Sequence, residues 1–196
     1  MEELILGQAS KLLEAMDKTV DKNLPYSIAE IVKFHSKGAA ASALASAWVP
    51  GAGGAAAVLA SAGFIWTMYG RIGAEIDLPI SKNILKSLAS GVATNIASAV
   101  VTAIALSTAF SLVPGIGSIG SSVIMAGVCY AMTLASGYVY LKIMTNLFNQ
   151  GIDPTTLSEN ELKNMAKKVA RDNDVKEVIK AAKKDFKSKR EQGEFD

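Results

Sequence analysis

The sequence predicts an all-α protein, a membrane helical bundle of two Pro-Gly-broken hairpins flanked by amphipathic and charged helices. Three observations predict this fold class. Residues 87–141 form a run of 55 without a charged side chain, and residues 38–70 form a second uncharged run of 33. Each run is broken once by Val-Pro-Gly, where proline cannot continue a helix and glycine can take a positive φ. Since about 20 apolar residues cross a bilayer, the longer run suffices for two crossings joined by a turn.

The charges of the 196-residue chain are confined to residues 1–37, 71–86 and 142–196, and the net charge is +2. The basic and acidic residues of each charged segment nearly balance, so no one-signed patch is present of the kind that nucleic acid requires. Cys129 is the only cysteine, which excludes an intramolecular disulfide. Its apolar surroundings predict a buried, unreactive thiol.

Residues 1–37 are expected to form amphipathic cytoplasmic helices. Apolar residues recur at helical spacing from Glu2 to about Lys22. Ser27 and Glu30 then form a capping box that begins a second helix at Ile28, which can run to position 49. His35, the only histidine, lies between two lysines in the sequence, so we expect a solvated or interfacial side chain rather than a catalytic base.

Residues 38–150 are expected to form the membrane hairpin domain, with limbs at about 38–49, 51–70, 84–112 and 117–148. The first limb is too short to cross a bilayer alone at 1.5 Å per residue, so the first hairpin either crosses with help from flanking lysines or is re-entrant. A polar connector from Arg71 to Lys86 follows it. The last two limbs are long enough to cross with tilt. The turns are assigned to Pro50, Gly51 and Gly53, and to Pro114, Gly115 and Gly117.

Residues 151–196 are expected to form a charged cytoplasmic helical tail. Thr156 with Glu159 and Ser158 with Glu161 are overlapping capping boxes at the start of one helix. A last helix, from Val175 to about Arg190, carries a thin apolar stripe, and residues 187–196 are expected to fray. The stripe consists of Val178, Ile179, Ala182 and Phe186.

Small residues recur every fourth position along the uncharged limbs. Lipid does not drive apolar helices together, so small residues that allow close backbone approach are typical of packed membrane helices. Asn95 is expected to add a hydrogen bond between helices. The residues assigned to helix packing are Gly63, Gly91, Asn95, Ala99, Gly127 and Ala131.

The sequence does not support either of two common phosphate-binding patterns. Residues 115–120 fit G-x-G-x-x-G, but no strand precedes them and no acidic residue follows within 30 positions. The chain also lacks the G-x-x-x-x-G-K-[ST] loop, so it is not itself a GTPase or ATPase. We expect a non-enzymatic protein without a cofactor or a metal site.

The order of these features resembles the bacterial domain of unknown function 697 family. The resemblance covers roughly residues 36–153 and depends on the two Val-Pro-Gly breaks, on Met68-Tyr69-Gly70 and on Ala135-Ser136-Gly137-Tyr138. Members of this family occur alone or attached to GTPase domains and are membrane associated. The resemblance therefore implies a separately encoded GTPase partner and a bacterial inner membrane, and the positive-inside rule puts both termini in the cytoplasm.

These features together predict an integral membrane protein that acts as a membrane anchor or as a docking module for a cytoplasmic partner such as a GTPase. Membrane lipid, that GTPase and a second copy of the chain are its candidate partners. One alternative is a pore-forming or channel protein, for which Ser90, Thr94, Ser98 and Thr102 supply a polar stripe. The other alternative is a soluble helical-bundle interaction module, in which the uncharged limbs form a buried centre.

Overall fold

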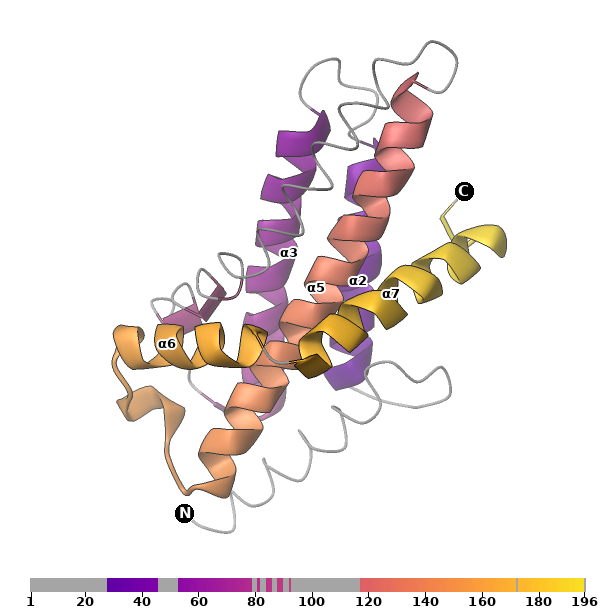
Figure 1. The fold of residues 1–196 in the computed structure, drawn as a ribbon. Coiled ribbons are helices and arrows are strands. Elements are labelled where there is room, and N and C mark those ends of the chain that lie inside the picture. Colours follow the sequence, from indigo (N-terminus) through magenta and orange to yellow (C-terminus); the bar gives the residue numbers. More distant parts are fainter. Residues whose placement is uncertain are drawn as a thin grey trace.

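The computed structural model is an all-α fold, which confirms that part of the predicted fold class (Figure 1). It describes residues 28–45, 53–78, 81, 84–85, 88–89, 92, 117–171 and 173–195, and within this part it contains no strand. Five α-helices and one short 3-10 helix are delimited within the described residues. They are α2 (Ile28–Ala45), α3 (Gly53–Glu75), α5 (Gly117–Asn149), η2 (Pro154–Thr156), α6 (Glu159–Ala170) and α7 (Asn173–Glu191).

Helix α5 forms the centre of the described bundle. Its 33 residues extend for about 50 Å at 1.5 Å per residue, and it packs against α2, α3, α6 and α7. A helix that is apolar on all sides must be surrounded, either by protein or by lipid. Here it is surrounded by protein, because most side chains from Met125 to Phe148 are buried.

Helices α2 and α3 lie along α5, with α2 running opposite to the other two (Figure 1). Val32, near the start of α2, and Met68 in α3 both lie next to Gly137 of α5. A Cβ atom at Gly137 would lie 2.8 Å from a methyl group of Val32 and 3.3 Å from the Met68 sulfur. The three helices therefore meet at a point where only glycine allows the observed spacing.

The transition from α5 to α6 is fixed by local hydrogen bonds. Gly151 has a φ of +69°, and the amide of Ile152 donates to the carbonyl of Leu147 over 2.9 Å, which ends α5 in the manner of a glycine C-cap. Ser158 and Glu161 form the predicted capping box of α6. The second predicted box is wrong, since α6 begins at Glu159 and the hydroxyl of Thr156 donates to the backbone oxygen of Asp153.

Helices α6 and α7 cross the surface of α5 (Figure 1). The stripe predicted for the last helix is confirmed in its buried members, Val178, Ala182 and Phe186, while Ile179 is half-buried. The prediction that residues 187–196 fray is wrong. Helix α7 continues to Glu191, and the ring of Phe195 packs 5.0 Å from the ring of Phe186.

Several predicted boundaries are corrected or lie outside the described residues. The start of α2 at Ile28 is confirmed, but α3 continues to Glu75, so Arg71 is helical and not part of a connector. The limb predicted at 117–148 matches α5. The helix predicted from Glu2 to Lys22 and most of the limb at 84–112 lie outside the described residues.

One helix in the described part of the chain is long and apolar enough to cross a membrane. It is the segment from Ser122 to Asn149 of α5, and 78% of its apolar window is buried inside the protein. A core helix of a soluble protein has the same properties. The membrane hairpins therefore stay a prediction.

Candidate functional site: the groove between α5 and α7

Two of the predicted turn residues lie at helix starts. Gly53 is the first residue of α3 and Gly117 is the first residue of α5. Pro50, Gly51, Pro114 and Gly115 lie outside the described residues, so the two Pro-Gly turns stay predictions.

The predicted packing residues do not form one group in the described part of the chain. At Gly63, no described atom lies within 4 Å of the place that a Cβ would occupy, whereas a Cβ at Gly127 would lie 3.1 Å from the ring of Phe186. Ala131 is buried in α5. Gly91, Asn95 and Ala99 lie outside the described residues. Close approach also occurs at Gly38, which lies under the ring of Phe64.

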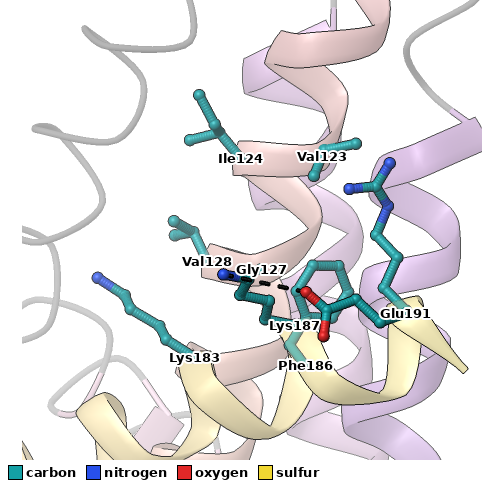
Figure 2. Close-up of a pocket in the computed structure, with 9 residues that line it drawn as sticks. Val123, Ile124, Gly127, Val128, Lys183, Phe186, Lys187 and Glu191 are labelled. Carbon is teal, nitrogen blue, oxygen red and sulfur yellow. Dashed lines mark ion pairs between the residues drawn. The ribbon is translucent and has the colours of Figure 1, made fainter.

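A groove of about 310 Å³ opens between the first half of α5 and the second half of α7 (Figure 2). Its apolar wall comes from Val123, Ile124 and Val128 on α5 and from the ring of Phe186 on α7. Gly127 allows this ring to pack directly on the backbone of α5, because a Cβ there would lie 3.1 Å from a ring carbon. The site therefore depends on the register with which α7 packs on α5.

The rim of this groove is cationic. Lys183, Lys187 and Arg190 line it from α7, and Glu191 is the only carboxylate among the lining residues. Lys187 and Glu191 lie 3.9 Å apart with both side chains mostly exposed, so this ion pair is weak (Figure 2). Lys183 and Arg190 have no ion-pair partner among the described residues, and their charges are available to an anion.

The rim belongs to a longer row of cations on α7, which we call the basic row. Apart from the adjacent Lys183 and Lys184, its members are spaced three or four residues apart, which puts them on one side of the helix, and all are exposed. Glu177, Glu191 and Glu194 are the exposed acidic residues nearby among the described residues. The row consists of Lys176, Lys180, Lys183, Lys184, Lys187 and Arg190.

A polar cluster fastens α7 to α5 beside the groove. The hydroxyl of Tyr130 on α5 donates to the carboxylate of Asp185 over 2.6 Å, and Lys189 donates to that hydroxyl over 2.7 Å. Lys189 and Asp185 also form an ion pair with only 14% and 16% of their side chains exposed. We call these three residues the α7 latch. It holds the apolar face of α7 against α5 and leaves the basic row outside.

No family model, curated protein or solved structure matches this chain. The resemblance to the domain of unknown function 697 family therefore stays a prediction. So does the GTPase partner that it implies.

The expectation that His35 is solvated is wrong. The side chain is 3% exposed and lies between the rings of Phe34 and Phe64, and its Nδ1 atom is 2.7 Å from the backbone oxygen of Ile31. Burial, and secondarily the nearby charge of Arg71, lower the pKa of this imidazole. The sequence signal that could have found this burial is the spacing of His35 from Ile28, Ile31 and Val32 on one helical face.

A line of buried hydroxyl groups follows α5 on its contacts with the other helices. The Tyr69 and Tyr140 rings stack at 4.4 Å, and the hydroxyl of Tyr69 donates to the backbone oxygen of Ser136 over 3.0 Å. The side-chain hydroxyls of Thr133, Ser136, Tyr140 and Thr145 have no hydrogen-bond partner among the described residues. Because these groups are buried without an adjoining cluster of ionisable residues, they do not form a catalytic arrangement.

The described residues contain no cluster of three or more histidine, cysteine, aspartate or glutamate side chains that could hold a metal ion. Cys129 is buried, as predicted. The groove and the basic row are thus the surfaces best suited to a function, and sequence reasoning missed both because it treated α7 as a free solvated tail.

Proposed function

We propose that this protein is a non-enzymatic, membrane-associated docking module, which attaches to an anionic membrane surface through α7 and offers the rest of the bundle to a cytoplasmic partner such as a GTPase. The observation that carries this proposal is the division of α7 into two faces. One face is apolar and sealed on α5, and the opposite face carries the six exposed cations of the basic row.

The energetics of such a row support attachment to anionic lipid. Each lysine or arginine near an anionic bilayer surface contributes about 1 kcal/mol. Six cations with three neighbouring carboxylates leave a local charge of about +3 among the described residues, and binding through this charge weakens as salt is added. The cytoplasmic leaflet of a bacterial inner membrane, the predicted location, presents anionic lipid to this face.

Two observations bear on whether the protein crosses the membrane or lies on it. The uncharged runs and the length of α5 support the predicted pair of membrane hairpins. The charged helix α7, however, packs directly along residues 123–130 of α5, at a level that would lie within the hydrocarbon if α5 crossed the bilayer. Since charged side chains are costly there, we favour attachment at the surface.

The proposal is tested by sedimentation with lipid vesicles. We expect the protein to sediment with vesicles that contain one third phosphatidylglycerol in phosphatidylcholine, and to remain in the supernatant with pure phosphatidylcholine. Lys180→Glu combined with Lys184→Glu reverses two charges of the row without touching the groove, and should weaken binding at least about tenfold, or about 1.4 kcal/mol.

A matched control makes the same change in net charge away from the row. Lys163→Glu combined with Lys168→Glu alters two cations of α6 and should leave vesicle binding within about twofold of the wild type. Equal losses in the two double variants would show that net charge, and not the basic row, governs binding, and would contradict the proposal.

A soluble helical-bundle interaction module is the second candidate function. The burial of α5 by protein favours it, because the apolar helix then needs no lipid. A monomer that is stable without detergent and does not sediment with anionic vesicles would support this candidate. The pore-forming alternative depends on Ser90, Thr94, Ser98 and Thr102, which lie outside the described residues, and conductance across planar bilayers is its test.

A further inference from the structure

We propose that the groove between α5 and α7 takes one acyl chain of an anionic lipid, drawn from the membrane surface on which the basic row lies. This inference rests on the proposed function, because the rim of the groove and the surface that attaches to the membrane share Lys183, Lys187 and Arg190.

The shape and lining of the groove suit an acyl chain. The groove has a volume of about 310 Å³, at the lower end of the range for small-molecule sites. This volume equals about ten water molecules at about 30 Å³ each, which gives room for part of one acyl chain. Val123, Ile124, Val128 and the Phe186 ring provide a surface without a hydrogen-bonding side chain, as a hydrocarbon chain requires.

The close packing of the Phe186 ring on Gly127 fixes the position of the aromatic wall of the groove. A Cβ at position 127 would lie 3.1 Å and 3.3 Å from two carbon atoms of the Phe186 ring, so even an alanine would crowd the ring. The ring is buried and held from its other side by Tyr130 and Phe195. A narrow apolar groove with a buried aromatic wall fits a thin chain, whereas the bulky apolar face of a partner helix needs several side-chain pockets.

The cationic rim of the groove suits a phosphate head group. Lys183 and Arg190 have no ion-pair partner among the described residues, and Lys187 has only the exposed contact with Glu191. Arginine binds phosphate oxygens through two parallel hydrogen bonds, and lysine adds a point charge. An acyl chain in the groove would leave its phosphate head group at this rim, where the three cations can contact it.

The apolar groove and its cationic rim together explain how a moderate basic row holds the protein on a membrane. A polybasic surface or a single inserted chain gives weak, reversible attachment, and the two signals together give stable attachment. The electrostatic part weakens with added salt, whereas burial of the chain does not depend on screening. A salt-resistant fraction of vesicle binding is therefore the signature of an occupied groove.

The test uses full-length protein on vesicles of one third phosphatidylglycerol in phosphatidylcholine, with a photoactivatable diazirine near the end of an acyl chain of the phosphatidylglycerol. After irradiation, mass spectrometry locates the labelled residues. We expect label on residues 123–128 and on Phe186. Ile124→Trp fills the groove from a half-buried position, and should reduce this label about tenfold, or about 1.4 kcal/mol in affinity.

The matched control introduces the same side chain elsewhere on α5. Asn146→Trp alters an exposed position far from the groove and should leave the label within about twofold of the wild type. Thermal unfolding of both variants identifies any loss of folded protein, and the label is compared per folded molecule. Equal label in Ile124→Trp and Asn146→Trp would overturn the inference.

The remaining outcomes separate this inference from the proposed function. Ile124→Trp leaves the basic row intact, so it should still sediment with anionic vesicles at low salt but lose the salt-resistant fraction. Wild-type protein that sediments yet carries its label only outside the groove overturns the acyl-chain site and leaves the docking function standing. Wild-type protein that does not sediment at all contradicts the docking function itself.

A concentration-dependent dimer that Ile124→Trp abolishes would assign the groove to a second copy of this chain, and would also overturn the lipid inference.

Discussion

At the scale of single residues, the spacing of the helices is controlled by the absence of a side chain at Gly137. Val32 and Met68 fill the space that a Cβ would need, and both are fully buried in the core. A methyl group at this position must displace at least one helix, since Val32 approaches through its stiff branched carbons. Gly63 is the opposite case, because the described structure leaves open space at its Cβ position.

This difference gives a paired prediction. Gly137→Ala should lower the free energy of unfolding by about 1–3 kcal/mol through overpacking. Gly63→Ala should raise it by about 0.5–1 kcal/mol, because alanine has the higher helix propensity and meets no neighbour there. Urea unfolding followed by circular dichroism measures both. Similar destabilisation by the two changes would mean that Gly63 also lies at a close helix contact, as the small-residue pattern predicts.

A second residue-scale prediction concerns pH. Burial lowers the pKa of His35 in the folded protein, so the unfolded chain, with an ordinary pKa of about 6.5, binds a proton more readily. Stability is therefore highest above about pH 6.5 and falls as the pH is lowered toward the folded pKa. The urea midpoint should be lower at pH 5.5 than at pH 7.5, and His35→Gln should reduce this difference.

Any histidine titration can be assigned to His35, because it is the only histidine. Glu161, whose pKa is lowered by hydrogen bonds from Ser158, loses its stabilising effect only at more acidic pH. An unchanged difference between the two pH values in His35→Gln would show that another group carries the pH dependence.

At the scale of the elements, the docking of α7 depends on the α7 latch. Asp185→Ala would leave the hydroxyl of Tyr130 and the ammonium of Lys189 without the carboxylate in a mostly buried site. Such a loss costs about 1–3 kcal/mol. The control is Glu191→Ala, which removes an ion pair whose lysine side chain is 80% exposed and should cost less than about 0.5 kcal/mol.

Hydrogen exchange provides the local measurement for the same pair. Asp185→Ala should increase amide exchange throughout α7 while α2 and α3 keep their protection, because α7 can open without the rest of the bundle. If exchange rises equally in all helices, α7 is part of a single cooperative unit and the latch is not a local fastening.

The elements also show what the sequence can and cannot predict. Gly151 predicted the C-terminal end of α5, and the Ser158 capping box predicted the start of α6, since these signals act over a few residues. The buried face of α7 followed from its apolar spacing. The packing of this face on α5 could not be predicted, because the contacts that join Asp185 and Lys189 to Tyr130 span 55 and 59 positions in the sequence. The groove was missed for the same reason, since it exists only where α7 lies on α5.

At the scale of the whole molecule, charge is distributed unevenly along the bundle. Because α2 runs opposite to α3 and α5, their charged ends come together, and Glu30, Arg71, Glu75 and Lys142 lie toward one end. The uncharged halves of the three helices lie toward the other end. The charged side chains of α7 lie beside the uncharged half of α5. If α7 stayed in this position while α5 entered a bilayer, each charged side chain carried into the hydrocarbon would cost about 2.5–3.5 kcal/mol. Insertion of α5 would therefore require α7 to leave this position.

The last prediction uses the contact between Lys37 and Glu194, which lie 2.7 Å apart and join α2 to the segment after α7. In a Cys129→Ala background, Lys37→Cys combined with Glu194→Cys supplies two accessible thiols that a short bis-maleimide reagent can join. If the protein attaches to membranes at their surface, crosslinking should proceed equally well in solution and on anionic vesicles, because α7 stays on α5. The crosslinked protein should still bind vesicles and should be released by carbonate at high pH. Loss of crosslinking on vesicles, together with resistance to carbonate, would instead mean that α7 leaves α5 when the helix enters the bilayer, as the predicted membrane hairpins require.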